Sequence, residues 1–371
     1  MTDVRFATPE GTAAYMARRR AAGLRDAARG FNGLALSSVG IGTYLGPSDT
    51  ITDRIYEAAL TRAWELGCNV VDTSINYRCQ RSERAIGRAL AAGIAAGAIQ
   101  RDQVFLCTKG GYIPYDGEPP ADPVAYFRQT FELPGIVSSN EVVAGSHSLA
   151  PKFLQHQLAC SLANLGVDGI DLYYLHNPET QLEELPIEKV QARLSAAFET
   201  LETCVDLGKI RYYGISTWNG LRASRGAGGF LPLELLVGIA RQVGGIDHHF
   251  RVVQLPYSLA MPEAVTRKNQ TAKNTPMTAL EAATALGLYV IGSAPLFQSR
   301  LAQGLPPEIR NRLPGLGLGT DAQRAIHFAR STPGIGTVLV GMKEVSHVEE
   351  NLKTLSVPVP SPAEFKRWLP E

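Results

Sequence analysis

The sequence predicts an α/β protein folded as a (β/α)8 barrel of the TIM type. From about residue 34 onward, short β-rich runs alternate with amphipathic helical stretches, which is typical of repeated βα units around a parallel sheet. Eight β-rich runs occur in that part of the chain, the number that closes such a barrel. We therefore expect a single catalytic barrel over residues 34–371, preceded by a helical N-terminal extension over residues 1–33.

The predicted strands are short runs rich in β-branched and aromatic residues. In chain order they cover residues 39–42, 69–72, 104–108, 170–175, 210–215, 252–254, 288–291 and 336–340. The helices between them have apolar residues at helical spacing. One helix is expected from Asp53 to Leu66, where Gly67 ends it, and another from Pro151 to Leu165, where Gly166 ends it.

One connection is much longer than the others. About forty residues with weak periodicity separate Lys109 from Pro151, whereas most loops in a compact domain are short. The segment follows the carboxyl end of a strand, so it should lie over the barrel mouth. A disordered surface insertion is one interpretation. Its aromatic content favours a lid-like insertion over residues 110–150 instead, because disordered segments are poor in such residues.

Composition excludes several classes of partner. The chain has 36 basic and 35 acidic residues, so it lacks the electrostatic footprint expected for binding nucleic acid or a membrane surface. It has no apolar signal core and no stretch long enough to span a membrane. Its five cysteines form no CxxC pair, which indicates reduced thiols. We expect a cytoplasmic protein that acts on a small molecule; the sequence leaves its oligomeric state open.

Polar residues at the ends of the predicted strands are the candidates for chemistry, because the active site of such a barrel lies at the carboxyl ends of its strands. Asp72 ends the second strand, Lys109 follows the third and His176 follows the fourth. Each alone has an ordinary structural explanation, as a turn cap, a solvated lysine or a turn histidine. Together with Tyr77 they form one chemically consistent set.

This set suits the reduction of a carbonyl, which needs a proton donor for the developing alkoxide as well as a hydride donor. A free tyrosine is a poor acid at neutral pH. We expect the Lys109 ammonium to lower the pKa of Tyr77, and Asp72 to hold that lysine charged and in place. A histidine near the same oxygen can orient the carbonyl and help to relay the proton.

Several motifs in the same order resemble those of the aldo-keto reductase family. They cover residues 70–77, 82–87, 108–109, 171–176, 208–216 and 341–352, and the similarity extends over essentially residues 34–355. The resemblance implies an oxidoreductase barrel that binds a nicotinamide cofactor extended across its mouth, without a Rossmann domain. The chain indeed has no GxGxxG after its first predicted strand.

The resemblance also assigns roles to individual residues. Tyr77 would be the general acid/base, Lys109 and Asp72 its tuning pair, and His176 the substrate-orienting residue. The implied cofactor contacts are Gly42, Thr43, Tyr44, Ser216, Thr217, Gln254, Ser293, Pro295, Leu296, Gln298, Gly341, Lys343, His347, Glu350 and Asn351. The substrate pocket is expected to be lined by Tyr44, Tyr112 and Trp218.

Some of these positions depart from the family pattern. Ser293 stands where an aromatic ring usually covers the nicotinamide, and Thr217 where an asparagine is usual. Gly341 and His347 stand where a lysine and an arginine usually bind the adenosine 2′-phosphate, which leaves Lys343 as the nearest cation. We expect NADP(H) to be favoured over NAD(H) as the cofactor.

Other functions fit the sequence less well. The histidines form no HxH or HExxH pattern, so no metal site is expected. A Schiff base on Lys109 would leave Asp72 and Tyr77 unexplained. The alternative that stays open is a nicotinamide-binding regulatory or sensor subunit on the same fold, although retention of all four catalytic residue types argues against it.

Overall fold

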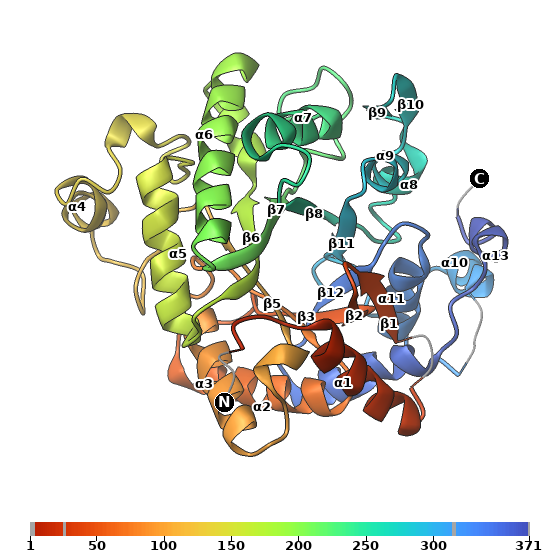
Figure 1. Ribbon diagram of the computed structural model, residues 1–371. Helices are drawn as coiled ribbons and strands as arrows, with labels where there is room; N and C mark the ends of the chain where they lie inside the picture. Colours follow the sequence, from red (N-terminus) through yellow and green to blue (C-terminus); the bar gives the residue numbers. More distant parts are fainter. Residues whose placement is uncertain (1–3, 25–26, 314–316, 370–371) are drawn as a thin grey trace.

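The computed structural model describes residues 4–24, 27–313 and 317–369 of the chain (Figure 1). Parts of the predicted extension (1–3 and 25–26) and of the predicted barrel domain (314–316 and 370–371) lie outside the described residues. Eight parallel strands form a closed barrel in the order β3, β4, β5, β6, β7, β8, β11 and β12. The barrel closes where β12 pairs with β3.

The strands of the barrel coincide with the predicted runs to within two residues at each end. They are β3 (Val39–Gly42), β4 (Val70–Asp72), β5 (Phe105–Gly110), β6 (Ile170–His176), β7 (Ile210–Ser216), β8 (Phe250–Pro256), β11 (Tyr289–Ser293) and β12 (Thr337–Gly341). Nearly all of their residues are buried, as expected for parallel strands that have the barrel core on one side and helices on the other. The predicted fold class is confirmed.

The helices surround the barrel (Figure 1). They are α1 (Pro9–Ala21), α2 (Thr50–Glu65), α3 (Arg81–Ala95), α4 (Pro123–Phe127), α5 (Pro151–Leu165), α6 (Ile187–Asp206), α7 (Leu233–Gly244), α8 (Glu263–Thr266), α9 (Ala279–Ala285), α10 (Pro307–Arg312), α11 (Asp321–Ser331), α12 (Val345–Asn351) and α13 (Pro362–Lys366), with short helical turns at Arg101–Gln103, Arg128–Glu132, Ser139–Glu141, Pro178–Glu183 and Leu352–Ser356. Helix α2 begins three residues before the expected Asp53, because the Asp49 side chain accepts a hydrogen bond of 2.7 Å from the Thr52 N–H and caps the helix there.

A hairpin closes the amino-terminal end of the barrel. Strands β1 (Ala28–Phe31) and β2 (Leu34–Ser37) pair antiparallel, so the expected boundary at residue 33 falls in their turn. Phe31 packs edge-on against Phe105 and Tyr212, with ring centroids 5.8 and 5.1 Å apart. A second small hairpin, β9 (Gln270–Ala272) with β10 (Thr275–Met277), lies between α8 and α9. The division into extension and barrel domain stays a prediction.

The long insertion packs mainly beside the barrel. Its helix α4 lies on the outer side of α5 (Figure 1), and Phe131 and Val137 form a buried cluster with Phe153 of α5. The insertion starts at Gly111, whose φ of +137° favours glycine and whose N–H donates to Gln157 at 2.8 Å. The expected lid role of residues 110–150 stays a prediction.

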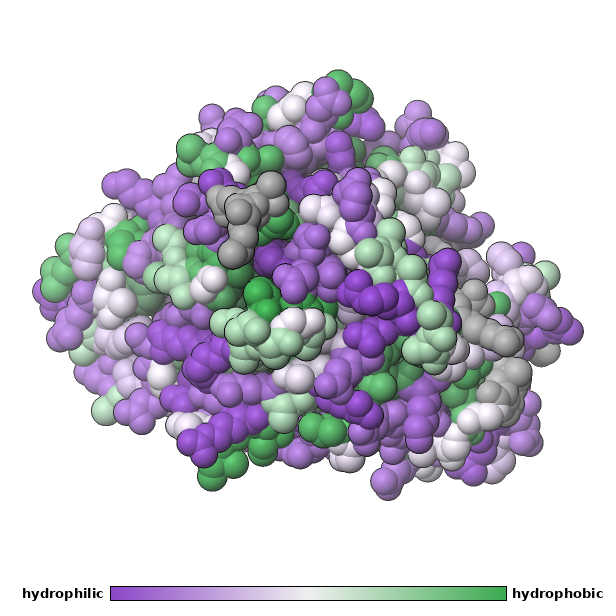
Figure 2. All heavy atoms as spheres, turned by 60° about the horizontal axis from the view of Figure 1, so that its bottom comes forward, coloured by the Kyte–Doolittle hydropathy of each residue, from purple (hydrophilic) through white to green (hydrophobic). Residues whose placement is uncertain are grey.

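The surface offers no broad apolar face on the side that Figure 2 shows, where hydrophobic and hydrophilic side chains are interspersed. Within the described ranges, no helix is long and apolar enough to cross a membrane.

Candidate active site

A cavity of about 450 Å³ opens at the carboxyl ends of the barrel strands. The strand register places residues around its floor: Gly341, Gly42 and Asp72 form one row, and His176, Ser216 and Gln254 form another. The structure brings most of the predicted site residues together as lining of this cavity, namely Gly42, Thr43, Tyr44, Asp72, Tyr77, Tyr112, His176, Ser216, Thr217, Trp218, Gln254, Ser293, Pro295, Leu296, Gln298 and Gly341.

A buried ion pair lies at the floor. The Lys109 ammonium donates a short hydrogen bond to Asp72 Oδ1 and another, of 2.7 Å, to the carbonyl of Thr73. Lys109 is fully buried. Burial alone would lower the pKa of Lys109, but the negative charge of Asp72 and the contact with Tyr77 outweigh it and raise this pKa. The lysine therefore stays charged, which is the condition for acting on a neighbouring phenol.

Tyr77 lies directly above this pair. The Lys109 Nζ is 5.0 Å from the centre of the Tyr77 ring, and the Tyr44 ring packs edge-on against it at 5.1 Å. The sequence predicted that Lys109 lowers the pKa of Tyr77, and the charge of Lys109 does act in that direction, although it does not set the net shift. Burial raises the pKa of Tyr77, and the charge of Lys109 offsets that rise only in part. Tyr77 is thus a protonated phenol at neutral pH, able to donate its proton.

The chain turns sharply after Tyr77. Arg78 has a φ of 48° and a buried guanidinium that donates to Asp53 Oδ1 of α2 at 2.5 Å and to the Pro47 carbonyl at 2.8 Å. Asp53 also accepts from Arg81 at 2.7 Å. These contacts join the loop that carries Tyr44 to the turn that follows Tyr77.

His176 ends β6 and packs edge-on against Tyr77, with ring centroids 5.8 Å apart. Its Nδ1 lies 3.2 Å from the hydroxyl oxygen of Ser74. Burial and the positive charge of Lys109 hold the pKa of His176 well below its ordinary value. The ring is therefore neutral at physiological pH and acts through hydrogen bonds.

A chain of hydrogen bonds through the Gln254 side-chain amide lies at the opposite side of the floor. Ser216 donates to Gln254 Oε1 at 2.9 Å, and Gln254 Nε2 donates to Asp72 Oδ2 at 2.9 Å. The neighbouring Thr217 is buried, and its hydroxyl oxygen has no hydrogen-bond partner among the described residues although it lines the cavity. An unpaired polar atom in this position fits a ligand that supplies the missing partner.

Exposed aromatic rings form the rim of the cavity. Tyr44 is 64% exposed and Trp218 is 40% exposed. The loop with Trp218 is held from below by Glu179, whose Oε1 accepts from the N–H groups of Trp218, Asn219 and Gly220 at 2.6, 2.9 and 3.2 Å. Tyr112 enters from the start of the insertion and packs edge-on against His176 at 5.1 Å.

Four predicted cofactor contacts do not line this cavity. Lys343 pairs with Glu344 at 3.4 Å and His347 is exposed on α12. Glu350 accepts from the Thr320 hydroxyl at 2.7 Å, and Asn351 is buried with its Oδ1 unpaired among the described residues. Lys109, beneath the floor, is likewise absent from the cavity lining.

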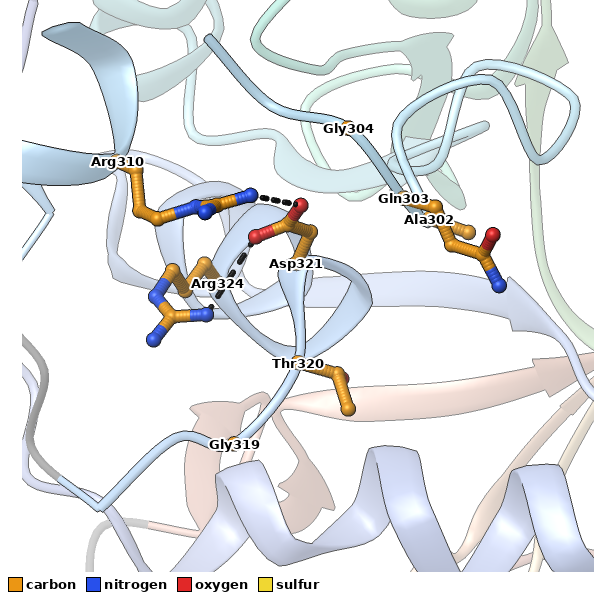
Figure 3. A pocket seen from close by; sticks show the side chains of 8 residues that line it. All are labelled: Ala302, Gln303, Gly304, Arg310, Gly319, Thr320, Asp321 and Arg324. Carbon is orange, nitrogen blue, oxygen red and sulfur yellow. Dashed lines mark hydrogen bonds and ion pairs between the residues drawn. The ribbon is translucent and has the colours of Figure 1, made fainter. Parts of the chain in front are cut away.

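A second hollow of about 370 Å³ lies beside Thr320. Figure 3 shows the guanidinium groups of Arg310 and Arg324 both directed at the Asp321 carboxylate, at 2.8 and 3.4 Å, while Gln303 points away from them. The charges in this hollow are thus paired with one another.

Sequence reasoning missed several residues that shape the site. Asn76 and Asn177 line the cavity, Ser74 contacts His176, and His147 donates through Nε2 to the His176 carbonyl at 2.7 Å. Asn76 and Asn177 adjoin Tyr77 and His176 in the chain, so their position beside predicted strand-end residues was a usable signal. His147 comes from the weakly patterned insertion, where no such signal exists.

Comparisons with known proteins agree with this geometry. The sequence model that represents the aldo/keto reductase family matches residues 38–302 of this chain. The NADP(+) aldo-keto reductase yakc from Schizosaccharomyces pombe is 31% identical over 183 residues, which are 49% of this chain and 42% of that protein. L-galactose dehydrogenase from Arabidopsis thaliana is 23% identical, with 89% of this chain and 87% of that protein covered. Except for L-galactose dehydrogenase, the curated relatives are matched over only about half of their own length.

Solved structures share the fold. An aldo/keto reductase from Klebsiella pneumoniae in complex with NADP and acetate has a TM-score of 0.62 at 21% identity, with 93% of this chain and 94% of that chain covered. The holo form of the aldo-keto reductase AKR11C1 from Bacillus halodurans has a TM-score of 0.63 at 18% identity, with 93% and 95% covered. Because the family model matches well over half of the sequence and the barrel is complete, this chain belongs to the aldo/keto reductase family.

Proposed function

We propose that this oxidoreductase transfers a hydride between NADP(H) and the carbonyl or alcohol carbon of a small, uncharged aldehyde, ketone or sugar-type substrate, with Tyr77 as general acid/base. The observation that carries the proposal is the arrangement of four side chains at the cavity floor. Tyr77 and His176 face the cavity, and the buried Lys109–Asp72 pair lies under Tyr77. A proton donor and a carbonyl-orienting ring thus share one wall.

The pKa directions support the reducing step. Tyr77 holds its proton at neutral pH because burial raises its pKa. The charged Lys109 stabilises the phenolate that remains after the proton moves to the substrate oxygen. Asp72 keeps Lys109 in place and is itself fixed by Gln254, so little rearrangement is needed as charge develops.

The residues present fit a nicotinamide cofactor, which would supply or accept the hydride. The unpaired Thr217 hydroxyl and the Ser216–Gln254 pair offer hydrogen bonds to a carboxamide group. The loop after β11, with Pro295, Leu296 and Gln298, lines the adjoining part of the cavity. The yakc relative is an NADP(+) enzyme by name and the Klebsiella structure holds NADP, which supports NADP(H) over NAD(H).

The charges of the residues that line the cavity favour an uncharged substrate. Among the described residues that line the cavity there is no lysine, arginine or glutamate, and the single carboxylate, Asp72, is already paired. A phosphorylated or carboxylated substrate would have to leave water without gaining a cation. The exposed Tyr44 and Trp218 rings offer instead the apolar and stacking surface that suits a neutral molecule.

The test replaces the Tyr77 hydroxyl. Fluorescence titration with NADPH, and with NADH for comparison, measures cofactor binding, which we expect Tyr77→Phe to retain. We expect its kcat on a panel of neutral and phosphorylated aldehydes and sugars to fall at least a hundredfold. The matched control is Tyr115→Phe, which removes a hydroxyl from the insertion rather than from the cavity. Equal turnover of Tyr77→Phe and the wild type would disprove the mechanism.

A further inference from the structure

Asn177 directly follows His176 and lines the cavity together with it. Its Nδ2 donates a hydrogen bond of 3.2 Å to the Tyr112 hydroxyl. Its backbone has a φ of 46°, and its N–H donates to the Ser216 carbonyl at 2.6 Å. Asparagine tolerates this left-handed conformation better than most residues. Backbone and side-chain contacts therefore both fix Asn177 at the cavity wall.

Tyr112 connects Asn177 to His176. Its ring packs edge-on against His176 and His147, with centroids 5.1 and 4.9 Å apart. Its hydroxyl oxygen lies 3.2 Å from the hydroxyl of Thr180 as well as from Asn177 Nδ2. The carboxamide of Asn177 thus lies beside the ring that is proposed to orient the reacting oxygen.

The Asn177 side chain has hydrogen-bonding groups to spare. A carboxamide carries two hydrogens to donate and one oxygen that accepts. Tyr112 takes one hydrogen, and within the described part of the chain nothing donates to Asn177 Oδ1. One donor and one acceptor on the same side chain match a hydroxyl, which both donates and accepts. An alkyl chain in that place would displace water and leave both groups unpaired.

The carboxamide of Asn177 is directed away from the groups that suit the cofactor. In the barrel, β6 lies between β5 and β7. Ser216 and Thr217, which fit a nicotinamide, lie at the end of β7, whereas Tyr112 follows β5. Because Asn177 Nδ2 donates to Tyr112, its carboxamide lies on the β5 side. A hydroxyl bound there would belong to the substrate.

We propose that Asn177 is a specificity-determining residue that binds a hydroxyl on the carbon next to the reacting carbonyl, with Tyr112 as the positioning residue that holds it. The substrates are then α-hydroxy aldehydes and ketones, open-chain sugars among them, or the corresponding vicinal diols in the direction of oxidation. This inference rests on the proposed function, because His176 has to hold the reacting oxygen for the neighbouring hydroxyl to reach Asn177.

Three aldehydes that differ by one hydroxyl test the proposal: propanal, 2-hydroxypropanal as separate enantiomers, and 3-hydroxypropanal. We expect the kcat/KM of the wild type to be higher for one enantiomer of 2-hydroxypropanal than for propanal. Asn177→Gly removes the carboxamide at a φ that glycine adopts readily, and this preference should fall roughly tenfold, the effect of one or two lost hydrogen bonds. Hydration of the aldehydes in solution is the same for both enzymes, so it cancels in this comparison.

The matched control is Asn274→Gly. Asn274 is also left-handed, with a φ of 61°, but it is exposed in the turn between β9 and β10 and should leave the preference unchanged. Tyr112→Phe keeps the ring and removes the hydroxyl that holds Asn177, so the preference should fall by less, roughly threefold. An unchanged preference in Asn177→Gly would overturn the proposal. A fall for 3-hydroxypropanal instead would overturn the assignment to the adjoining carbon.

Binding is measured separately from turnover, in Tyr77→Phe loaded with NADPH. Titration with the three aldehydes, followed by NADPH fluorescence, should show 2-hydroxypropanal bound roughly tenfold more tightly than propanal. Adding Asn177→Gly to Tyr77→Phe should remove this difference. Equal affinities for the two aldehydes in Tyr77→Phe would count against the proposal even if the enzyme turns both over.

The outcomes separate this proposal from the proposed function. If Tyr77→Phe keeps full turnover while the preference still depends on Asn177, the proposed mechanism fails and the assignment of Asn177 stands. If Tyr77→Phe loses turnover while Asn177→Gly keeps the preference, the mechanism stands and the assignment of Asn177 fails.

Discussion

His147 shows how a single buried residue couples the insertion to the active site. Its Nε2 donates to the His176 carbonyl, and its Nδ1 accepts from Gln181 Nε2 at 2.8 Å. Burial lowers the pKa of His147 to about 4, although the hydrogen bond to His176 opposes this shift. The residue is thus neutral in the folded protein under all ordinary conditions.

The folded state should therefore lose stability in mild acid. Because the pKa of His147 is lower in the folded than in the unfolded chain, the unfolded state takes up a proton first as the pH falls from about 6.5 towards 4. Between pH 7 and 5 this residue should remove about 2 kcal/mol from the free energy of unfolding. Urea unfolding of the wild type and His147→Gln at both pH values measures the difference.

His147→Gln is expected to start from a lower stability at pH 7 but to lose less on acidification. His248 and His327 also have lowered pKa values and are unchanged in the variant, so they cancel in the comparison. Identical losses for the two proteins would mean that His147 is already protonated in the folded state.

At the scale of elements, the turn after β7 depends on one carboxylate. Glu179 lies in the helical turn after β6, yet it binds three consecutive N–H groups of the turn that carries Trp218. Hydrogen bonds to a charged acceptor are stronger than those to a neutral one. The position of Trp218 at the cavity rim thus depends on a contact between two loops.

Glu179→Gln should loosen this turn while keeping its shape. We expect KM for the substrate to rise about fivefold to thirtyfold with a smaller change in kcat, because one buried charge-assisted contact contributes about 1–2 kcal/mol. Steady-state kinetics measure this split. Glu183→Gln, an exposed position in the same helical turn, is the matched control. A fall in kcat alone would instead place Glu179 in the chemistry.

Over the whole molecule, the amino-terminal hairpin and the active site lie at opposite ends of the barrel. Phe31 is 6% exposed and packs with Phe105 and Tyr212 below the barrel core. The proposed catalytic groups lie at the carboxyl ends of the barrel strands, so the hairpin and the proposed chemistry are separated in space.

Phe31→Ala should accordingly reduce stability without altering the site. Removing the ring leaves a cavity, and we expect the free energy of unfolding to fall by about 3 kcal/mol. Below the unfolding transition, kcat should stay within about twofold of the wild type, since the rigid barrel separates the two ends. Chemical unfolding and steady-state assays measure both; Ile51→Ala, on the exposed face of α2, is the control.

The local sequence determined the barrel and the set of residues proposed to be catalytic. Each strand has its own run of apolar residues, and parallel strands bring their carboxyl ends to one edge, so Asp72, Lys109 and His176 had to meet there once eight βα units were counted. Family motifs added Tyr77 and most of the residues that line the cavity. Helix α5 was predicted to the residue because proline and glycine mark its two ends.

Only the tertiary structure decided what depends on residues far apart in the chain. The pKa of Tyr77 rises because burial outweighs the charge of Lys109. A short sequence motif does not reveal how deeply a side chain is buried. The insertion packs against α5 through an aromatic cluster whose partners are not adjacent in the sequence. His176 Nδ1 lies 3.2 Å from the hydroxyl oxygen of Ser74, 102 residues away in the chain, a contact that only folding brings about.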